Sequence, residues 1–249
     1  MAIQIISGTT TKYLENSQNT VSFNLRQTPT VGNVLVAAVL SYQGLSPSIT
    51  DNQTGNTYIN QIGETVGSAM NVFLFTCIVN SASGTFTLTV TGIDPNNNLS
   101  GSVLVYEVAG LDTNNLVSGS AANTATSDAS GTDLTSSLTN TKATSIFFAT
   151  FGPEANGAVT VTAGQGFSFD PTNGVVLFSD GVSPRTALEY QIVNTIAPQQ
   201  GYLNYTASFG NSIFNAVILC LNGFQQTPNV LESSAINTYT GYKDEVAIY

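Results

Sequence analysis

The chain has 249 residues, of which only 8% are charged, and its 15 acidic and 5 basic side chains give a formal net charge of −10. The basic residues are scattered, so we expect neither a nucleic-acid partner nor a polybasic membrane-binding patch. Histidine is absent, which excludes Ser-His and Cys-His nucleophiles as well as histidine-ligated zinc.

The first eight residues, Met1-Ala-Ile-Gln-Ile-Ile-Ser-Gly8, lack the basic and long apolar regions of a signal peptide. No later run approaches the roughly 18 apolar residues of a membrane span. A composition rich in Thr, Asn and Gly but poor in charge is nevertheless what we expect of a protein exposed outside cells. A virion protein, made in the cytoplasm and released by lysis, satisfies both observations. We therefore expect a place on the virion surface, with an extracellular or cell-surface position as the alternative.

Alternation of apolar and polar residues dominates the chain, and β-branched residues fill the runs between Gly, Asn, Asp and Pro clusters. Residues 34–40 and 217–221 are apolar on both faces, as is typical of strands in the middle of a sandwich or at an interface. Residues 85–91 alternate strictly, which predicts that Phe86, Leu88 and Val90 face a core while the threonines face water.

One succession of strand-like segments occurs twice, about 113 residues apart. Residues 77–80, 84–92 and 103–111 reappear as residues 191–194, 201–210 and 216–224. A repeat at fixed spacing indicates a repeated architecture. The sequence therefore predicts an all-β fold: an antiparallel, jelly-roll-like β-sandwich built from two sequence-related halves. Whether these halves form one interleaved sandwich or two tandem ones stays open.

The repeat also divides the chain into four parts. Residues 1–112 form the first β half and residues 142–224 the second, with a merger of the two halves into one sandwich as the alternative. Residues 113–141, rich in Ser, Thr, Asn and Gly, are interpreted as an exposed connection with one strand near Leu134. Residues 225–249 are interpreted as a C-terminal arm.

The two cysteines, Cys77 and Cys220, each lie in an apolar strand run. A thiol in that setting usually behaves as a small buried hydrophobe, which favours two free thiols. A disulfide across the halves requires Cα atoms within about 7 Å of each other and stays open.

Four segments of the chain resemble a widespread, uncharacterised β-sandwich domain family of bacterial surface proteins and phage structural proteins. They are Gly32-Asn-Val-Leu-Val-Ala-Ala-Val39, residues 49–58, residues 105–110 and the closing strand 217–224. The resemblance covers about residues 20–224. It implies a jelly-roll-like sandwich in an extracellular or virion setting, and it implies no catalytic residue.

The sharpest local motif runs from Asp51 to Asn56. Its carboxylate, amide and main-chain oxygens are hard ligands of the kind that Ca²⁺ prefers, so Asp51 is a weak calcium candidate. A dedicated calcium site usually recruits several carboxylates, whereas this loop has one. A structural turn capped by Asp51 is the favoured interpretation, and we expect no metal and no cofactor.

The hydrolytic route that survives without histidine is a paired-carboxylate glycosidase. Glu107 and Glu189 are the candidates because each interrupts an apolar strand, where a carboxylate is partly desolvated. They stand at different points of the repeat, however, and each alternates with apolar neighbours as a solvent-facing strand residue does. We therefore expect no catalytic residue and no enzyme.

A glycan-binding site is the more serious rival, because tyrosine rings stack on sugars. The weak candidates are Tyr13, Tyr42, Tyr202 and Tyr205. Tryptophan, which offers the largest flat aromatic face, is absent. The alternative is that these tyrosines fill core edges and place their hydroxyls at the water boundary.

The last segment, residues 225–249, has no counterpart after the first half and contains the β-prone stretches 236–242 and 246–249. Such stretches add to the exposed sheet edge of a neighbouring subunit, which predicts an assembly arm. A frayed tail is the alternative. The predicted arm residues are Ile236, Tyr239, Tyr242, Val246, Ile248 and Tyr249.

Together these observations predict a non-enzymatic structural or capsid decoration protein of a phage virion. It would act by self-association, as a homo-oligomer, or by docking on a lattice of a viral capsid or tail protein. One alternative is a glycan-binding or adhesive module. The other is a subunit of an extracellular filament in which the tail exchanges strands.

Overall fold

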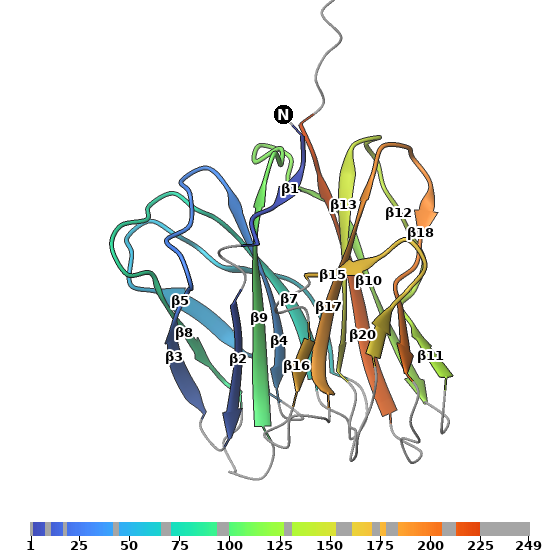
Figure 1. Cartoon of the computed structure of the whole chain (residues 1–249), viewed down its shortest axis with the longest axis horizontal. Helices are drawn as coiled ribbons and strands as arrows, with labels where there is room; N and C mark the ends of the chain where they lie inside the picture. The colour runs from blue at the N-terminus through green and yellow to red at the C-terminus, as the bar shows by residue number, and fades with distance from the viewer. Residues whose placement is uncertain are drawn as a thin grey trace, which may run out of the picture.

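The computed structural model contains only strands, turns and loops in the part of the chain that it describes (Figure 1). The described residues are 2–7, 11–16, 19–41, 45–65, 71–93, 100–126, 131–152, 161–170, 175–177, 184–205 and 213–224. All strand pairs within them are antiparallel and the sheets pack face to face, which confirms the all-β antiparallel sandwich. Over the same residues, no helix is long and apolar enough to cross a membrane.

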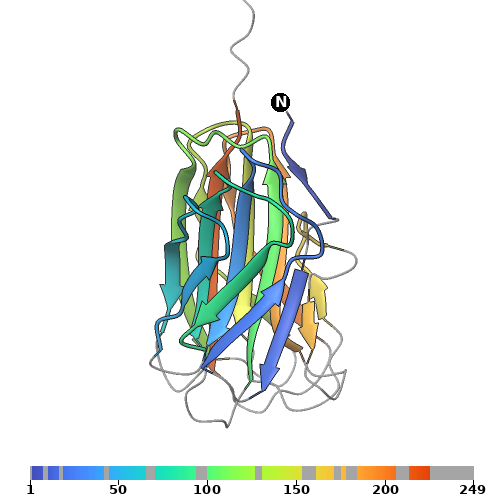
Figure 2. The same ribbon diagram turned by 90° about the vertical axis from the view of Figure 1, so that its left-hand side faces the viewer.

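The first half contains a large sheet and a small sheet. The first large sheet has the order β1 (Gln4–Ile5), β9 (Ser100–Ala109), β4 (Val34–Ser41), β7 (Asn71–Ile78), β6 (Ile59–Glu64), and β2 (Thr11–Asn16) also pairs with β9. The first small sheet has the order β3 (Thr20–Asn24), β8 (Thr87–Thr91), β5 (Ser48–Asp51). Figure 2 views the molecule from this side, with the blue to green strands of the first half nearest the viewer.

The second half has the same two kinds of sheet. Its large sheet has the order β10 (Val117–Thr126), β20 (Ile213–Asn222), β13 (Ser145–Gly152), β17 (Pro184–Val193), β15 (Ser168–Phe169), and β16 (Val175–Leu177) also pairs with β17. Its small sheet has the order β11 (Gly131–Leu134), β19 (Tyr202–Tyr205), β14 (Val161–Ala163). A two-stranded ribbon joins β12 (Leu138–Thr139) to β18 (Pro198–Gln199).

Strand pairing follows one scheme in both halves. β9 lies between β2 and β4, as β20 lies between β10 and β13, and β8 lies between β3 and β5, as β19 lies between β11 and β14. Among the described strands, every named pair joins strands of the same half, and an isolated bridge links Leu111 to Gly223. The halves are thus two tandem sandwiches rather than one interleaved sandwich. Their relationship in sequence stays a prediction.

The two large sheets pack against each other, and this places four sheets in the order small, large, large, small. All eight residues of β4 are buried, because the strand serves two cores. Leu35, Ala37 and Val39 enter the core of the first sandwich, whereas the residues between them enter a cluster shared by both halves. We call that cluster the shared core. It includes Val34, Val36, Ala38, Leu40, Leu104, Tyr106, Ile146, Phe148, Leu188, Val217, Leu219 and Leu221.

The second sandwich divides its residues in the same way. Ile218 and Cys220 of β20 face its own core, while the alternating Val217, Leu219 and Leu221 face the shared core. This double burial explains why residues 34–40 and 217–221 are apolar on both faces. The alternation of residues 85–91 is confirmed as well, because Phe86, Leu88 and Val90 are at most 1% exposed.

Polar contacts cross the shared core at Tyr106 of β9. Its hydroxyl donates to the Leu188 carbonyl oxygen at 2.8 Å and accepts from the Asp170 main-chain N–H at 3.2 Å. Its ring packs edge-on against Phe148 and Tyr190, with centroids 6.1 and 6.2 Å away. Tyr106 is fully buried, and this burial raises the pKa of its hydroxyl, which keeps the donor protonated.

The interpretation of residues 113–141 as a connection with a single strand near Leu134 is wrong for residues 117–126. Residues 117–126 form β10, which pairs along nearly the whole of β20, and β11 covers the strand expected near Leu134. An edge strand is held by main-chain hydrogen bonds on one side, so small polar side chains do not prevent its pairing. Composition alone therefore did not reveal β10.

Both cysteines are free, buried thiols. Cys77 lies in the core of the first sandwich and Cys220 in the core of the second, on opposite sides of the shared core. Burial raises the pKa of each thiol to about 11, so both are neutral near pH 7.

Replacing Tyr106 by Phe tests the polar link across the shared core. The change keeps the ring and removes the hydroxyl that bonds Leu188 and Asp170. Because buried groups then lose a partner, we expect unfolding to become easier by about 1–3 kcal/mol. Chemical denaturation measures the loss. The control, Tyr202→Phe, removes a partly exposed hydroxyl and should change stability by about 0.5 kcal/mol or less. Equal losses of stability in the two variants would contradict a stabilising role of the Tyr106 hydroxyl in the shared core.

Candidate functional site

Glu107 and Glu189, the two candidate acids, are both buried, so the expectation that they face solvent is wrong. Glu107 is 1% exposed and Glu189 is 0% exposed. The physical reason is that other sheets pack on both faces of β9 and β17. The alternation of apolar and polar residues in these strands therefore does not indicate a solvent-exposed face. The two acids point into different sandwiches, with the shared core between them, so they do not form a catalytic pair.

Both carboxylates hold main-chain groups in place. Glu107 Oε1 accepts from the Thr30 N–H at 2.9 Å and from Asn33 Nδ2 at 2.6 Å, which fixes the segment that leads into β4. Glu189 Oε1 accepts from the Tyr202 N–H at 2.8 Å, and its Oε2 accepts from the Gly164 N–H at 2.9 Å. Glu189 thereby ties its large-sheet strand β17 to the second small sheet.

Burial raises the pKa of Glu189 to about 8, although its two main-chain hydrogen bonds act in the opposite direction. Desolvation disfavours the charged form more strongly than these two donors favour it. The position of Glu189 beneath β19 makes it a support for the outer surface.

Asp51 is surrounded by donors of its own loop. Its Oδ1 accepts from the Gln53 N–H at 2.8 Å, and its Oδ2 accepts from Asn56 Nδ2 and from the Tyr58 hydroxyl, each at 2.9 Å. Asn56 in turn holds the main chain of Asn80. Among the described residues, no group of three or more Cys, Asp or Glu side chains is placed to hold a metal. The geometry is that of a capped turn, and the calcium candidate gains no further ligand from it.

The four candidate tyrosines fall into two groups. Tyr13 pairs through its main chain with Val103, and Tyr205 pairs with Gly131 and Val161, but their side chains lie outside the described part. Tyr42 and the whole predicted arm, residues 225–249, also lie outside it. Tyr202 is described in full, and its side chain is partly exposed on the second small sheet.

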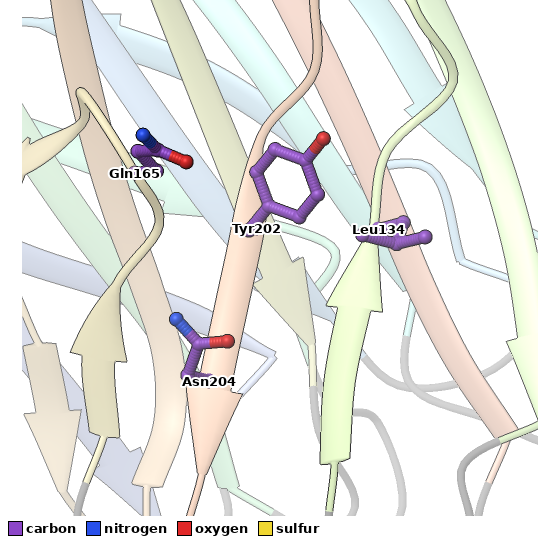
Figure 3. Close-up of a pocket in the computed structure, with 4 residues that line it drawn as sticks. All are labelled: Leu134, Gln165, Tyr202 and Asn204. Atoms are coloured by element: carbon purple, nitrogen blue, oxygen red, sulfur yellow. The ribbon is translucent and has the colours of Figure 1, made fainter.

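Two adjoining hollows flank Tyr202 on the outer surface of the second half, and we call them together the Tyr202 platform. Figure 3 shows the four residues that line the first hollow. The first has a volume of about 460 Å³ and the second about 310 Å³. Tyr202 and Gln165 line both hollows. Leu134 and Asn204 complete the first hollow, whereas Ser137, Pro198, Gln199 and Gln200 complete the second.

The local sequence explains how these side chains reach the surface. Strand alternation on β19 turns Leu203 into the core of the second sandwich and leaves Tyr202 and Asn204 partly exposed. Gln165 occupies a turn closed by the Phe167 N–H donating to the Gly164 carbonyl oxygen at 3.0 Å. Gly166 takes a φ of +83°, a conformation that glycine adopts without strain.

Tyr202 is held rigidly from below and from one side. A Cβ on Gly164 would lie 2.5 Å from Tyr202 Cβ, so this close contact requires glycine. Thr135 is fully buried and makes two hydrogen bonds to Gly201, the residue before Tyr202. Its Oγ1 accepts from the Gly201 N–H at 2.9 Å, and its N–H donates to the Gly201 carbonyl oxygen at 3.1 Å. The Tyr202 hydroxyl donates to Gln200 Oε1 at 3.2 Å.

The platform offers binding groups rather than reactive ones. Its described lining comprises one phenol, one hydroxyl, amides and apolar side chains, and none of these is charged. Sequence reasoning named Tyr202 but missed Gln165 and Asn204. The Gly164-Gln-Gly166 turn and the alternation of Tyr202 with Asn204 were the signals available, but only the pairing of β14 with β19 brings them together.

A third hollow, of about 480 Å³, runs along the seam between the halves. Ile59 of β6 and Val117 of β10 line it and are 55% and 36% exposed. Asp112, which precedes the lining residue Thr113, pairs with Lys142, with Nζ 2.6 Å from Oδ2, and the hydrogen bond from Lys142 holds the pKa of Asp112 below its usual value. This seam hollow lies between β6 of the first sandwich and the start of β10 of the second.

Replacing Glu189 by Gln tests the support beneath the platform. Gln presents one acceptor and two donors, so one of the two buried N–H groups loses its partner and stability should fall by about 1–3 kcal/mol. The raised pKa also means that the folded wild type binds the Glu189 proton more tightly than the unfolded chain does. This contribution is complete below about pH 4.5 and is lost as the pH rises through about 8.

Urea denaturation at a series of pH values across this range measures both effects. Wild-type stability should contain a component that declines with rising pH, and Glu189→Gln should lack it. Parallel pH profiles for the two proteins would show that Glu189 does not titrate as described.

Comparisons with known proteins leave the assignment to the chain's own geometry. No family model, curated protein or solved structure matches the chain. The resemblance of residues 20–224 to a β-sandwich family of surface and phage proteins therefore stays a prediction. The antiparallel packed sheets and the Tyr202 platform are the observations that bear on function.

Proposed function

We propose that this chain is a non-enzymatic structural or capsid decoration protein of a phage virion, which acts by self-association or by docking on a protein lattice. The carrying observation is that both candidate acids, Glu107 and Glu189, serve as buried main-chain clamps in separate sandwiches. Their geometry supports a role in rigidity and gives no support to acid–base chemistry.

The packing of the halves supports the same proposal. The shared core joins two sandwiches through their large sheets, so central strands such as β4 and β13 are covered on both faces and the small sheets face outward. Rigidity of a subunit limits the conformational entropy lost when it is fixed in an assembly.

The outer surface of the first small sheet is uncharged and hydroxyl-rich. The hydroxyls of Ser22 and Thr89 lie 2.8 Å apart, and the Thr87 hydroxyl donates to Asn24 Oδ1 at 2.8 Å. Cross-strand hydroxyl pairs stabilise a sheet without charge. The surface therefore suits a protein exposed to changing salt, because screening has few ion pairs to weaken.

The small sheets also provide edges for assembly. Among the described strands, β3, β5, β11 and β14 each pair with a single neighbour, so one edge of each accepts a further strand. The β-prone stretches 236–242 and 246–249 would supply such a strand from a neighbouring subunit, with Ile236, Tyr239, Tyr242, Val246, Ile248 and Tyr249 as the contacting residues.

Truncation after Phe224 tests assembly through the arm. We expect the full chain to form defined oligomers in mass photometry and negative-stain microscopy, and the truncated chain to remain a monomer with an unchanged circular dichroism spectrum. A full-length control with Ile236→Asp and Val246→Asp should behave like the truncation, because a charged residue opposes burial in a sheet.

Two other results would redirect the proposal. Open fibres of the full chain would favour the extracellular filament over the decoration protein. Monomers in both preparations, including after addition of a candidate capsid or tail lattice, would contradict the assembly role.

A further inference from the structure

The Tyr202 platform has the chemistry of a carbohydrate site, and we propose that it binds a neutral oligosaccharide. Such binding goes beyond the proposed structural role and does not depend on it. It assigns to the second small sheet an adhesive function, by which the protein would attach to a glycan surface.

The functional groups of the Tyr202 platform match those of a sugar. A pyranose ring has an apolar C–H face and a rim of hydroxyls, each of which is both a donor and an acceptor. Tyr202 supplies an aromatic face with a polar tip, and Leu134 adds apolar surface beside it. Gln165 and Asn204 each supply an amide with two donors and one acceptor oxygen, which pairs with adjacent hydroxyls.

The charge of the Tyr202 platform indicates which class of ligand it would accept. None of the described residues that line the two hollows is charged, and the chain as a whole carries a formal charge of −10. A phosphate or a carboxylate would meet no cation among these described lining residues and would be repelled by the overall field. The buried Glu189 lies behind the platform and has its two oxygens engaged by main-chain donors. A neutral ligand is therefore favoured over an anionic one.

The size of the two hollows indicates the size of the ligand. Volumes of about 460 and 310 Å³ fall within the range of small-molecule sites. Because Tyr202 and Gln165 line both hollows, a single ligand would run across the two with Tyr202 between its units. This geometry fits a chain of at least two sugars better than a single one.

Preorganisation of Tyr202 also favours binding. Tyr202 is held in position before any ligand binds. Its main-chain N–H donates to Glu189, its Cβ packs against Gly164, and its hydroxyl donates to Gln200 Oε1. Two fully buried side chains, Glu189 and Thr135, anchor this stretch from below. A fixed aromatic side chain loses little entropy on binding, which raises affinity.

The first small sheet provides an internal control because its outer surface has different chemistry. The partly exposed positions of its central strand β8 are Thr87, Thr89 and Thr91, whereas β19 presents Tyr202 and Asn204. Asn24 of β3 is an exposed amide on that other surface. Asn24→Ala is thus a matched control for Asn204→Ala.

The experiment uses the full chain on an array of immobilised neutral oligosaccharides together with sialylated and sulfated ones, followed by calorimetry with the best binder. We expect binding to neutral glycans of two or more units and none that requires an anionic group. Tyr202→Ala should weaken binding by about tenfold or more, because the stacking surface is lost. Tyr202→Phe should retain binding within about threefold, since the ring remains. Asn204→Ala should weaken binding, and Asn24→Ala should not.

Several results would overturn the proposal: no neutral glycan bound, strict dependence on an anionic group, or equal affinities for wild type and Tyr202→Ala. Thermal unfolding of each variant shows that the fold is intact. The truncation after Phe224 keeps the platform and should bind the same glycans, so failure of the assembly role and failure of the glycan site are separate results.

Discussion

Burial of both faces of the central strands of the two large sheets is the constraint on which the rest of this structure depends. β4 and β20 each place alternate residues in the core of their own sandwich and in the shared core. The hydrophobic effect acts on both sides of these strands at once, so the halves are stabilised by their contact as well as by their own cores. Tyr106 adds the polar specificity, because its hydroxyl meets defined main-chain partners in the opposite half.

The same constraint decides what the acidic residues do. A carboxylate on β9 or β17 is removed from water whichever way it points, and it must then find donors inside the protein. Glu107 and Glu189 find them in main-chain and amide N–H groups at the ends of neighbouring segments. Two residues that resemble catalytic acids in the sequence thereby become supports, and Glu189 extends that support to the surface beneath Tyr202.

The central strands of the large sheets are covered, whereas the small sheets present most of their outer faces to other molecules. The first small sheet presents hydroxyl pairs such as Ser22 with Thr89, while the second presents Tyr202 and Asn204. A repeated scheme of strand pairing has in this way produced two different outer surfaces. The structural role proposed for the chain rests on its rigidity, whereas the glycan site rests on this difference between the two outer surfaces.

Sequence by itself determined the all-β class, the inward positions of Phe86, Leu88 and Val90, and the doubly apolar strands 34–40 and 217–221, because side-chain alternation is a local property with a period of two. It did not determine that residues 117–126 form an edge strand, that Glu107 and Glu189 are buried, or that Gln165 joins Tyr202 and Asn204. These features depend on which strands pair and which sheets stack. Only tertiary structure decided them, since such contacts join residues far apart in the chain.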